Sequence, residues 1–278
     1  MIAFRRARER HDTGSEADQG NAMTKPIFDT HFHIIDPRFP VVENQGFLPP
    51  VFTVDDYRAR TDGLNVRGGT VIAGSFQGTQ TEYMYDALAR LGPTFVGVIQ
   101  LHATVTDEEI IRLNAAGVRA VRFNLYRGGS AGIEDLDRLA RRVHDVAGWH
   151  AELYCDAAAL DPLFDIIANL PKVSIDHLGM TQAGVPQVIA LAERGARVKA
   201  TGFGRTEVDV PAALRDLASA NPACLMFGSD LPSQRARRPF MPSDLDLIRE
   251  TLGETLADRV FWDNAVAFYR PRELPVTA

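Results

Sequence analysis

Two histidines separated by one residue mark the stretch of the sequence best suited to chemistry. His31 and His33 follow an apolar run that begins at Ile27, and Pro37 ends the extended segment. Side chains along a strand alternate between its faces, so both imidazoles are expected on one face and Phe32 on the other. Two neutral imidazoles on one face can share a metal ion, polarise a carbonyl oxygen or pass on a proton. The alternative is a pair of strand-end histidines that only hydrogen-bond to loops.

A third histidine and an aspartate occupy comparable positions later in the chain. His177 follows the apolar run Val173–Ile175, and Asp230 follows Leu225–Phe227. Each has a structural alternative, because an Asp-His pair can hold a loop and an aspartate beside glycine and serine often caps one. If these four side chains meet, three imidazoles and a carboxylate would suit one divalent metal, typically zinc with a water in its open position.

The elements that must position these residues repeat along the chain. Eight short apolar runs alternate with amphipathic segments of roughly ten residues, which is the pattern of a (β/α)8 barrel. The runs are the stretch that begins at Ile27, followed by Gly69–Ala73, Phe95–Leu101, Val118–Phe123, His150–Tyr154, Val173–Ile175, Val198–Thr201 and Leu225–Phe227. Helices are expected from Thr53, over Glu82–Leu91, from Thr106, and over 133–147, 160–170, 186–193, 211–220, 243–252 and 254–268.

An open doubly wound sheet would show the same alternation, and the polar residues decide between the two. They collect where the apolar runs end: His31, His33, Ser75, Arg122, Tyr154, His177, Arg205 and Asp230. In a barrel the carboxyl ends of all strands converge on one mouth, whereas the first and last strands of an open sheet need not be neighbours. We therefore predict a single α/β domain with a TIM-barrel fold.

Composition narrows the class of protein. The chain has 278 residues, 45% of them hydrophobic, which suits one large barrel domain. A formal net charge of -6 argues against a nucleic-acid binder and leaves a small molecule as the expected partner. With only two cysteines, Cys155 and Cys224, a disulfide scaffold is not expected and a reducing cytoplasm is the default location.

Two segments differ from the rest of the chain. Residues 1–24 are polar and rich in arginine, and they are expected to be a disordered leader before a barrel domain over 25–278. No run in the sequence is long and apolar enough for a membrane span, so no membrane partner is expected. The proline-rich loop 36–52 is a long connection that could line or cover a site.

The motifs resemble those of a known family. Four are quoted for it: Asp29-Thr30-His31-Phe32-His33, Ile175-Asp176-His177-Leu178-Gly179, Phe227-Gly228-Ser229-Asp230-Leu231-Pro232, and Asn264-Ala265 followed by Phe268. Together they look like the amidohydrolase-related proteins of the second type. Three finer matches resemble the branch of 2-pyrone-4,6-dicarboxylate lactonase and sugar-lactone hydrolases: Val121-Arg122-Phe123-Asn124, Glu152-Leu153-Tyr154 and Thr201-Gly202-Phe203-Gly204-Arg205.

The resemblance implies a role for the aspartate and leaves the metal open. Asp230 would take a proton from the attacking water and return it to the leaving oxygen. Members of the superfamily with two metals carry a carboxylated lysine and a further histidine where this sequence has Arg122 and Tyr154, so a two-metal site is not expected. The lactonase branch includes enzymes that work without metal, their histidines polarising the carbonyl. One divalent ion and no ion both remain open.

Arginines and hydroxyl groups are the candidates for substrate binding. Arg122 lies inside a buried strand pattern, where its guanidinium must either pair with a carboxylate or be reserved for an anionic ligand. Arg127 and Arg205 follow strands, and all three arginines are hypothesised to bind one or two substrate carboxylates. Ser75 and Tyr154 could donate hydrogen bonds to the substrate or be ordinary strand-end packing.

The residues after Asp230 leave the substrate undetermined. The family often has Trp-Pro-His there, whereas this chain has Leu231-Pro232-Ser233. The following arginines, Arg235, Arg237 and Arg238, are interpreted as a solvated cluster.

Hydrolysis of a small, carboxylated lactone is the predicted activity. Asp230 would activate water, and His31, His33 and His177 would polarise the ester carbonyl directly or through one metal ion. The alternatives are a metal-dependent decarboxylase of the same superfamily and a barrel that binds a ligand without turning it over.

Overall fold

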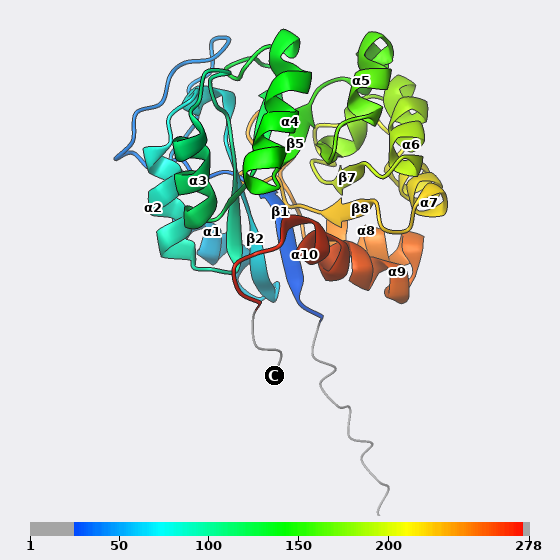
Figure 1. The fold of residues 1–278 in the computed structure, drawn as a ribbon. Helices are drawn as coiled ribbons and strands as arrows, with labels where there is room; N and C mark the ends of the chain where they lie inside the picture. The colour runs from blue at the N-terminus through cyan, green and yellow to red at the C-terminus, as the bar shows by residue number, and fades with distance from the viewer. Residues whose placement is uncertain (1–24, 275–278) are drawn as a thin grey trace, which may run out of the picture.

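The predicted barrel is confirmed by a computed structural model, in which residues 25–274 are described (Figure 1). Eight parallel strands follow one another around the sheet in chain order. They are β1 (Ile27–Phe32), β2 (Val66–Ile72), β3 (Phe95–Ile99), β4 (Val118–Asn124), β5 (His150–Tyr154), β6 (Val173–Ile175), β7 (Arg197–Ala200) and β8 (Leu225–Phe227). The expected leader, residues 1–24, lies outside the described residues.

The barrel closes where β1 and β8 lie side by side, in blue and yellow-orange in Figure 1. The backbone N–H of Asp230 donates to the carbonyl of His31 at 2.7 Å, and that of His33 donates to the carbonyl of Leu231 at 2.8 Å. These bonds lie just beyond the end of β8, so closing the barrel also sets the positions of His31 and Asp230. First and last strands are therefore neighbours, as the barrel interpretation required.

Asp29 belongs to the same motif as His31 and His33, and its side chain holds β1 and the segment after β8 together. Its buried carboxylate accepts hydrogen bonds from the backbone N–H of Ser229 at 2.8 Å and from the Ser229 hydroxyl at 2.6 Å. The Tyr57 hydroxyl donates to the same carboxylate at 3.0 Å, and the backbone N–H of His31 donates at 3.1 Å. Since a buried carboxylate needs several donors, Asp29 acts as a structural clamp between the two strands.

Helices surround the sheet, and their starts follow the sequence signals. Thr53 caps α1 in a reciprocal pair with Asp56, and Thr106 caps α3. The helices are α1 (Val54–Thr61), α2 (Glu82–Leu91), α3 (Asp107–Ala116), α4 (Leu136–Ala147), α5 (Phe164–Ala168), α6 (Val185–Glu193), α7 (Val210–Ala220), α8 (Ser243–Leu252), α9 (Glu254–Asp258) and α10 (Asn264–Tyr269). Within residues 25–274 no helix has the length and apolarity that crossing a membrane requires.

Two expected helices differ from the structure. The segment 160–170 begins with 3-10 turns and reaches α-helical geometry only in α5, because Asp161 and Pro162 start a tighter turn. The segment 254–268 is interrupted by a π-helical turn at Arg259–Asp263. That turn places Asn264, whose side-chain amide donates to the carbonyl of Leu225 at the start of β8.

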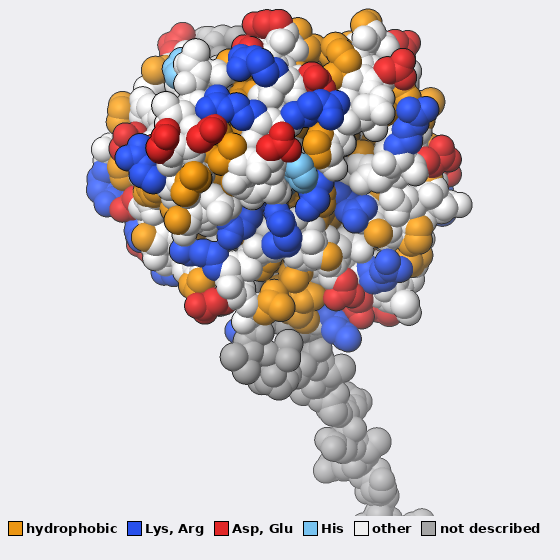
Figure 2. Space-filling view, in the orientation of Figure 1, with side chains coloured by type: hydrophobic (Ala, Val, Ile, Leu, Met, Phe, Trp, Pro, Cys, Tyr) orange, Lys and Arg blue, Asp and Glu red, His pale blue; other side chains and the backbone are white. Residues whose placement is uncertain are grey.

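Alternating side chains divide the molecule into an outer and an inner core. Outward residues such as Phe32 and Leu153 pack against the helices, and Phe32 stacks on Tyr57 with ring centroids 3.7 Å apart. The inner apolar residues pack against α10, drawn in red in Figure 1. On the outer surface, Figure 2 shows Lys and Arg side chains with Asp and Glu side chains among them.

Candidate active site

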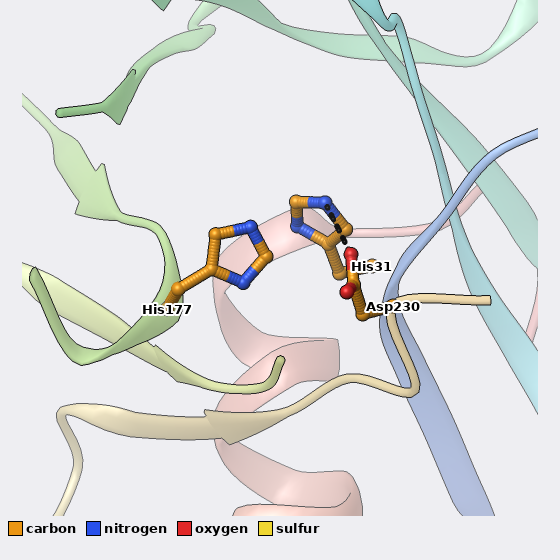
Figure 3. Close-up of side chains that lie close together, drawn as sticks. All are labelled: His31, His177 and Asp230. Carbon is orange, nitrogen blue, oxygen red and sulfur yellow. Dashed lines mark ion pairs between the residues drawn. The ribbon is translucent and has the colours of Figure 1, made fainter. Parts of the chain in front are cut away.

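Three of the four predicted catalytic residues lie close together inside the barrel (Figure 3). His31 comes from β1, His177 follows β6, and Asp230 follows β8. Their ligand atoms lie within 4.8 Å of one another, and His31 Nε2 is 3.8 Å from Asp230 Oδ1. The rings of His31 and His177 have centroids 4.7 Å apart. Barrel closure thus brings together side chains from opposite ends of the sequence.

Each of these three residues has one buried polar atom without a hydrogen-bond partner. Within the described residues, His31 Nε2, His177 Nδ1 and Asp230 Oδ1 are buried and accept or donate no hydrogen bond. Buried polar atoms are normally paired, and leaving three of them unpaired within one site is costly. The space between them is therefore suited to an oxygen atom of a substrate or water, or to an ion.

Local backbone geometry aims two of the side chains into this space. His177 and Asp230 have φ angles of 51° and 58°, in the left-handed region that non-glycine residues rarely adopt. Gly202 packs directly against His177, and a Cβ at that position would lie 2.5 Å from His177 Nδ1. The site therefore requires a glycine at the end of β7 to leave room for the imidazole.

His33 lies beside the group but is oriented differently. Its ring centroid is 5.2 Å from that of His31, and its Nδ1 is 2.8 Å from the carbonyl oxygen of Ile72. A carbonyl only accepts, so this contact places the proton on Nδ1 and leaves a lone pair on Nε2. Burial, with the charge of Arg122, lowers the pKa of His33 to about 3. His33 is thus a neutral imidazole that offers an acceptor.

The other two histidines are also neutral at ordinary pH. Burial lowers the pKa of His31 and of His177 well below the usual value. For His177 the charge of Arg205 adds to the effect of burial. Neutral imidazoles can bind a metal or donate through one N–H, so the sequence-based expectations for these groups are compatible with their protonation.

Asp230 has one oxygen fixed and one oxygen available. Arg205 contacts Asp230 Oδ2 through Nη2 at 2.6 Å and Nε at 2.7 Å, and it also donates to the carbonyl of Gln234. Burial raises the pKa of Asp230 to about 6, although Arg205 opposes that rise. A carboxyl group with this pKa is mainly ionised at neutral pH and can still take up a proton, as a general base must.

Next to His31, inside the barrel, lie four buried charged side chains, which we call the ionic layer: Arg122, Glu152, Asp176 and Lys199. Lys199 Nζ is 2.6 Å from Glu152 Oε2, 3.2 Å from Asp176 Oδ1 and 3.4 Å from His31 Nδ1. Arg122 Nη2 is 2.6 Å from Asp176 Oδ2. Burial would raise the pKa of Asp176, but Lys199 and Arg122 lower it well below its usual value. Two cations and two carboxylates therefore neutralise one another beside the histidines.

Lys199 was not predicted to contribute to the site. Its signal in the sequence is a lysine inside the short apolar run of β7, where a charge must find a buried partner. That partner belongs to other strands, so the sequence alone does not identify it.

Arg122 shows the arrangement that the sequence analysis gave as the alternative to ligand binding. Its guanidinium is bridged to Asp176 and also donates to the carbonyl of Ala73 at 2.6 Å. It lies over the ring of Tyr154 at 5.1 Å, and that ring packs edge-on against His177. Both Arg122 and Tyr154 still line the cavity above the site, so their proposed contacts with substrate remain predictions.

A cavity with about 410 Å³ of space open to solvent leads to the site. Its lining residues are His33, Phe47, Gly74, Ser75, Phe76, Arg122, Asn124, Arg127, Tyr154, His177, Arg205, Gln234 and Arg235. The predicted binding residues Ser75, Arg127 and Arg205 are all among them. Part of loop 36–52 contributes Phe47, so the expectation that this loop lines a site agrees with its position.

The three arginines after β8 do not form one solvated cluster. Arg237 fits that interpretation, because its exposed side chain pairs with exposed Glu207. Arg238 pairs with the buried carboxylate of Asp244. Arg235 instead lines the cavity, so the sequence interpretation was wrong for this residue.

Comparisons with known proteins agree with the motifs and the fold. The family model described as Amidohydrolase matches residues 28–270. The chain is 31% identical over 251 residues to 4-sulfomuconolactone hydrolase of Rhizobium radiobacter, covering 82% of this chain and 83% of that protein. It is 30% identical over 156 residues to a 2-pyrone-4,6-dicarboxylate hydrolase of Comamonas testosteroni, covering 54% of this chain and 51% of that protein.

A solved structure shows the same fold. A probable 2-pyrone-4,6-dicarboxylic acid hydrolase of Acinetobacter baumannii, with citric acid bound, superposes with a TM-score of 0.74 at 21% identity. The match covers 88% of this chain and 99% of the other. The resemblance drawn from the motifs is thus confirmed.

Proposed function

Because this chain belongs to the amidohydrolase family, we propose that it is a hydrolase that opens a small, anionic lactone by attack of an activated water on the ester carbonyl. The observation that carries the proposal is the convergence of His31, His177 and Asp230, with three unpaired buried atoms, at the base of an arginine-lined cavity. The two relatives, which are hydrolases of a sulfonated lactone and of a pyrone dicarboxylate by name, support the ester as the bond cleaved.

Asp230 is the proposed general base. Its free Oδ1 would take the proton of the attacking water as oxygen bonds to the carbonyl carbon, and the carboxylic acid formed would then protonate the leaving ring oxygen. Arg205 holds the other oxygen, which keeps Oδ1 directed at the site while the proton is transferred.

The charge that develops on the carbonyl oxygen would be stabilised by N–H groups of His31 and His177. Both are neutral, and each has a buried ring nitrogen without a hydrogen-bond partner. His33 is less suited to this donation, because its Nδ1 proton is held by the carbonyl of Ile72. We propose that His33 Nε2 accepts a hydrogen bond from the water or from a hydroxyl of the substrate.

The donors also fit one divalent metal ion. His31, His177 and Asp230 would hold it, and their buried, unpaired atoms are of the types that zinc accepts. When bound, such an ion would polarise the carbonyl. Asp176, Glu152 and Asp230 are already paired with Arg122, Lys199 and Arg205, so these side chains balance one another's charges before any ion binds.

Hydrolysis of a lactone panel followed with a pH indicator tests this function. Ring opening by water releases a proton at neutral pH, and we expect this signal with at least one carboxylated lactone. Repeating the assay after treatment with a chelator decides whether a metal is needed. Release of carbon dioxide from an aromatic acid, with no reaction of any lactone, would instead identify a decarboxylase and contradict the proposal.

Asp230→Asn provides the test of the assigned base. We expect proton release to slow by roughly 10²–10⁴-fold, the usual contribution of a general base, while the substrate still binds. Asp246→Asn is the matched control, since Asp246 is an exposed carboxylate on α8 and should leave the rate unchanged. An Asp230→Asn enzyme with near-normal turnover would show that another group activates the water.

A further inference from the structure

Two arginines at the cavity rim differ from those deeper in the cavity. The deeper pair, Arg122 and Arg205, are each bound to a buried aspartate. Arg127 and Arg235 also line the cavity, yet within residues 25–274 neither lies within ion-pair distance of a carboxylate. Their positive charges are therefore not neutralised by the described part of the chain.

One turn of loop 36–52 holds both rim arginines through neutral groups. The backbones of Asn44 and Phe47 exchange two hydrogen bonds, which makes the turn compact. Arg127 Nη1 donates to Gln45 Oε1 at 3.0 Å, and the Asn44 side chain donates to the carbonyl of Arg127 at 3.1 Å. Arg235 Nη2 donates to the carbonyl of Asn44, and its guanidinium lies over the ring of Phe47 at 4.3 Å. The turn of loop 36–52 thus holds the segment that follows β4 and the segment that follows β8 next to each other.

The electrostatics of the rim favour an anion. The residues that line the cavity include four arginines and no aspartate or glutamate, although the whole chain has a net charge of -6. Burial and then the charge of Arg127 lower the pKa of Arg235. Like charges held near each other at a partly buried rim repel, and a bound anion relieves that repulsion.

We propose that Arg127 and Arg235 form an oxyanion subsite, the rim subsite, that binds a carboxylate or sulfonate of the substrate remote from the ester bond that is cleaved. Each guanidinium has five N–H donors, so the contacts with the turn leave donors available for two-pronged binding of an oxyanion. The proposal rests on the proposed function and adds to it Arg235 and a second oxyanionic group on the anionic lactone. It assigns to Arg235 the selection of substrates that carry this second group.

Binding of isophthalate, a planar aromatic dianion that is not an ester, tests the subsite independently of hydrolysis. Titration calorimetry would compare it with 3-sulfobenzoate and with neutral dimethyl isophthalate. We expect Arg235→Gln and Arg127→Gln each to raise the Kd of a dianion by roughly tenfold or more and to leave the neutral ester within about twofold. The two dianions show whether a carboxylate or a sulfonate is preferred at the rim.

Two further variants test whether the charge of Arg235, rather than its contacts with the loop, is responsible for binding the dianions. Arg235→Lys keeps the charge without the planar fork, and it should retain part of the preference for the dianions. Arg237→Gln removes the exposed arginine two residues away and should change neither probe. Thermal unfolding of every variant would show that the proteins are folded.

Three results would overturn the rim subsite: equal binding of isophthalate by Arg235→Gln and the unchanged protein, an equal loss for the neutral ester, or no preference of the unchanged protein for either dianion. If binding of the dianions depends on Arg235 while no lactone is hydrolysed, the proposed function fails and the subsite stands. If lactones are hydrolysed and Arg235→Gln has no effect on the dianions, only the subsite fails.

Discussion

The ionic layer and the rim subsite are both rich in cations, but their charges are balanced in different ways. In the ionic layer, Arg122 and Lys199 contact Glu152 and Asp176 within the barrel, and each of the four side chains is almost fully buried. At the rim, Arg127 and Arg235 contact an amide oxygen, a carbonyl oxygen and aromatic rings.

The difference separates charges that maintain the site from charges available to a ligand. Burying an unpaired charge is very costly, so the interior must supply its own counter-ions. A partly exposed guanidinium keeps water on its free side and can remain without a carboxylate until a ligand arrives. The cation best placed to act on His31 is accordingly the interior Lys199, whereas the cations best placed to select substrates are at the rim.

Removing Lys199, one of the two cations of the ionic layer, should give the largest loss of stability. Lys199→Met leaves Glu152 and Asp176 with less compensation in a buried environment, and we expect the free energy of unfolding to fall by about 3–5 kcal/mol. Denaturant unfolding measures this change. Lys172→Met is the control, because Lys172 is only partly buried and should change the stability by less than about 0.5 kcal/mol. Equal stabilities for the two variants would show that the charge of Lys199 is not needed to compensate the buried carboxylates of the ionic layer.

Arg205 tests whether a fixed cation sets the protonation of the proposed base. In enzyme that has been treated with a chelator, kcat/KM should fall roughly tenfold per pH unit below the Asp230 pKa of about 6, because the base must be ionised. Arg205→Gln removes the charge that favours the carboxylate, so the pKa should rise and this limb should move to higher pH by about one to three units.

The matched control for this pH shift is Arg238→Gln, which breaks a similar pair with Asp244 outside the cavity. Its pH profile should coincide with that of the unchanged enzyme. If the acidic limb of the kcat/KM profile did not move in Arg205→Gln, that limb would reflect the titration of a group other than Asp230.

The rim should give the smallest effect on folding. We expect Arg127→Gln to change the free energy of unfolding by no more than about 0.5 kcal/mol, because its partners are neutral and its side chain is only partly buried. Denaturant unfolding beside Lys199→Met provides the comparison. If both variants lost several kcal/mol, Arg127 would be a structural residue and not one reserved for a ligand.

Much of the fold was accessible from local patterns. The runs at β5, β6 and β8 have the predicted bounds, as do α2 and α8, because apolar periodicity and helix caps act over a few residues. Predictions that depended on backbone detail were less accurate, as the π-helical turn before α10 shows.

The sequence likewise indicated some features of the candidate site and not others. The residue types at the ends of strands indicated His31, His177 and Asp230 as partners, and barrel closure places them together. The sequence did not indicate that Asp29 holds β1 and the segment after β8 together or that His33 is turned toward a backbone carbonyl.

The sequence by itself determined the eightfold strand and helix order, the family and the candidate site residues at the ends of the strands, since these follow from patterns within short segments. Only the tertiary structure decided which charges neutralise one another. Arg122 and Lys199 find their carboxylates on neighbouring strands, whereas Arg127 and Arg235 meet at a turn of a distant loop. Pairing of this kind depends on distances between segments remote in the chain, and these distances are set only when the barrel closes.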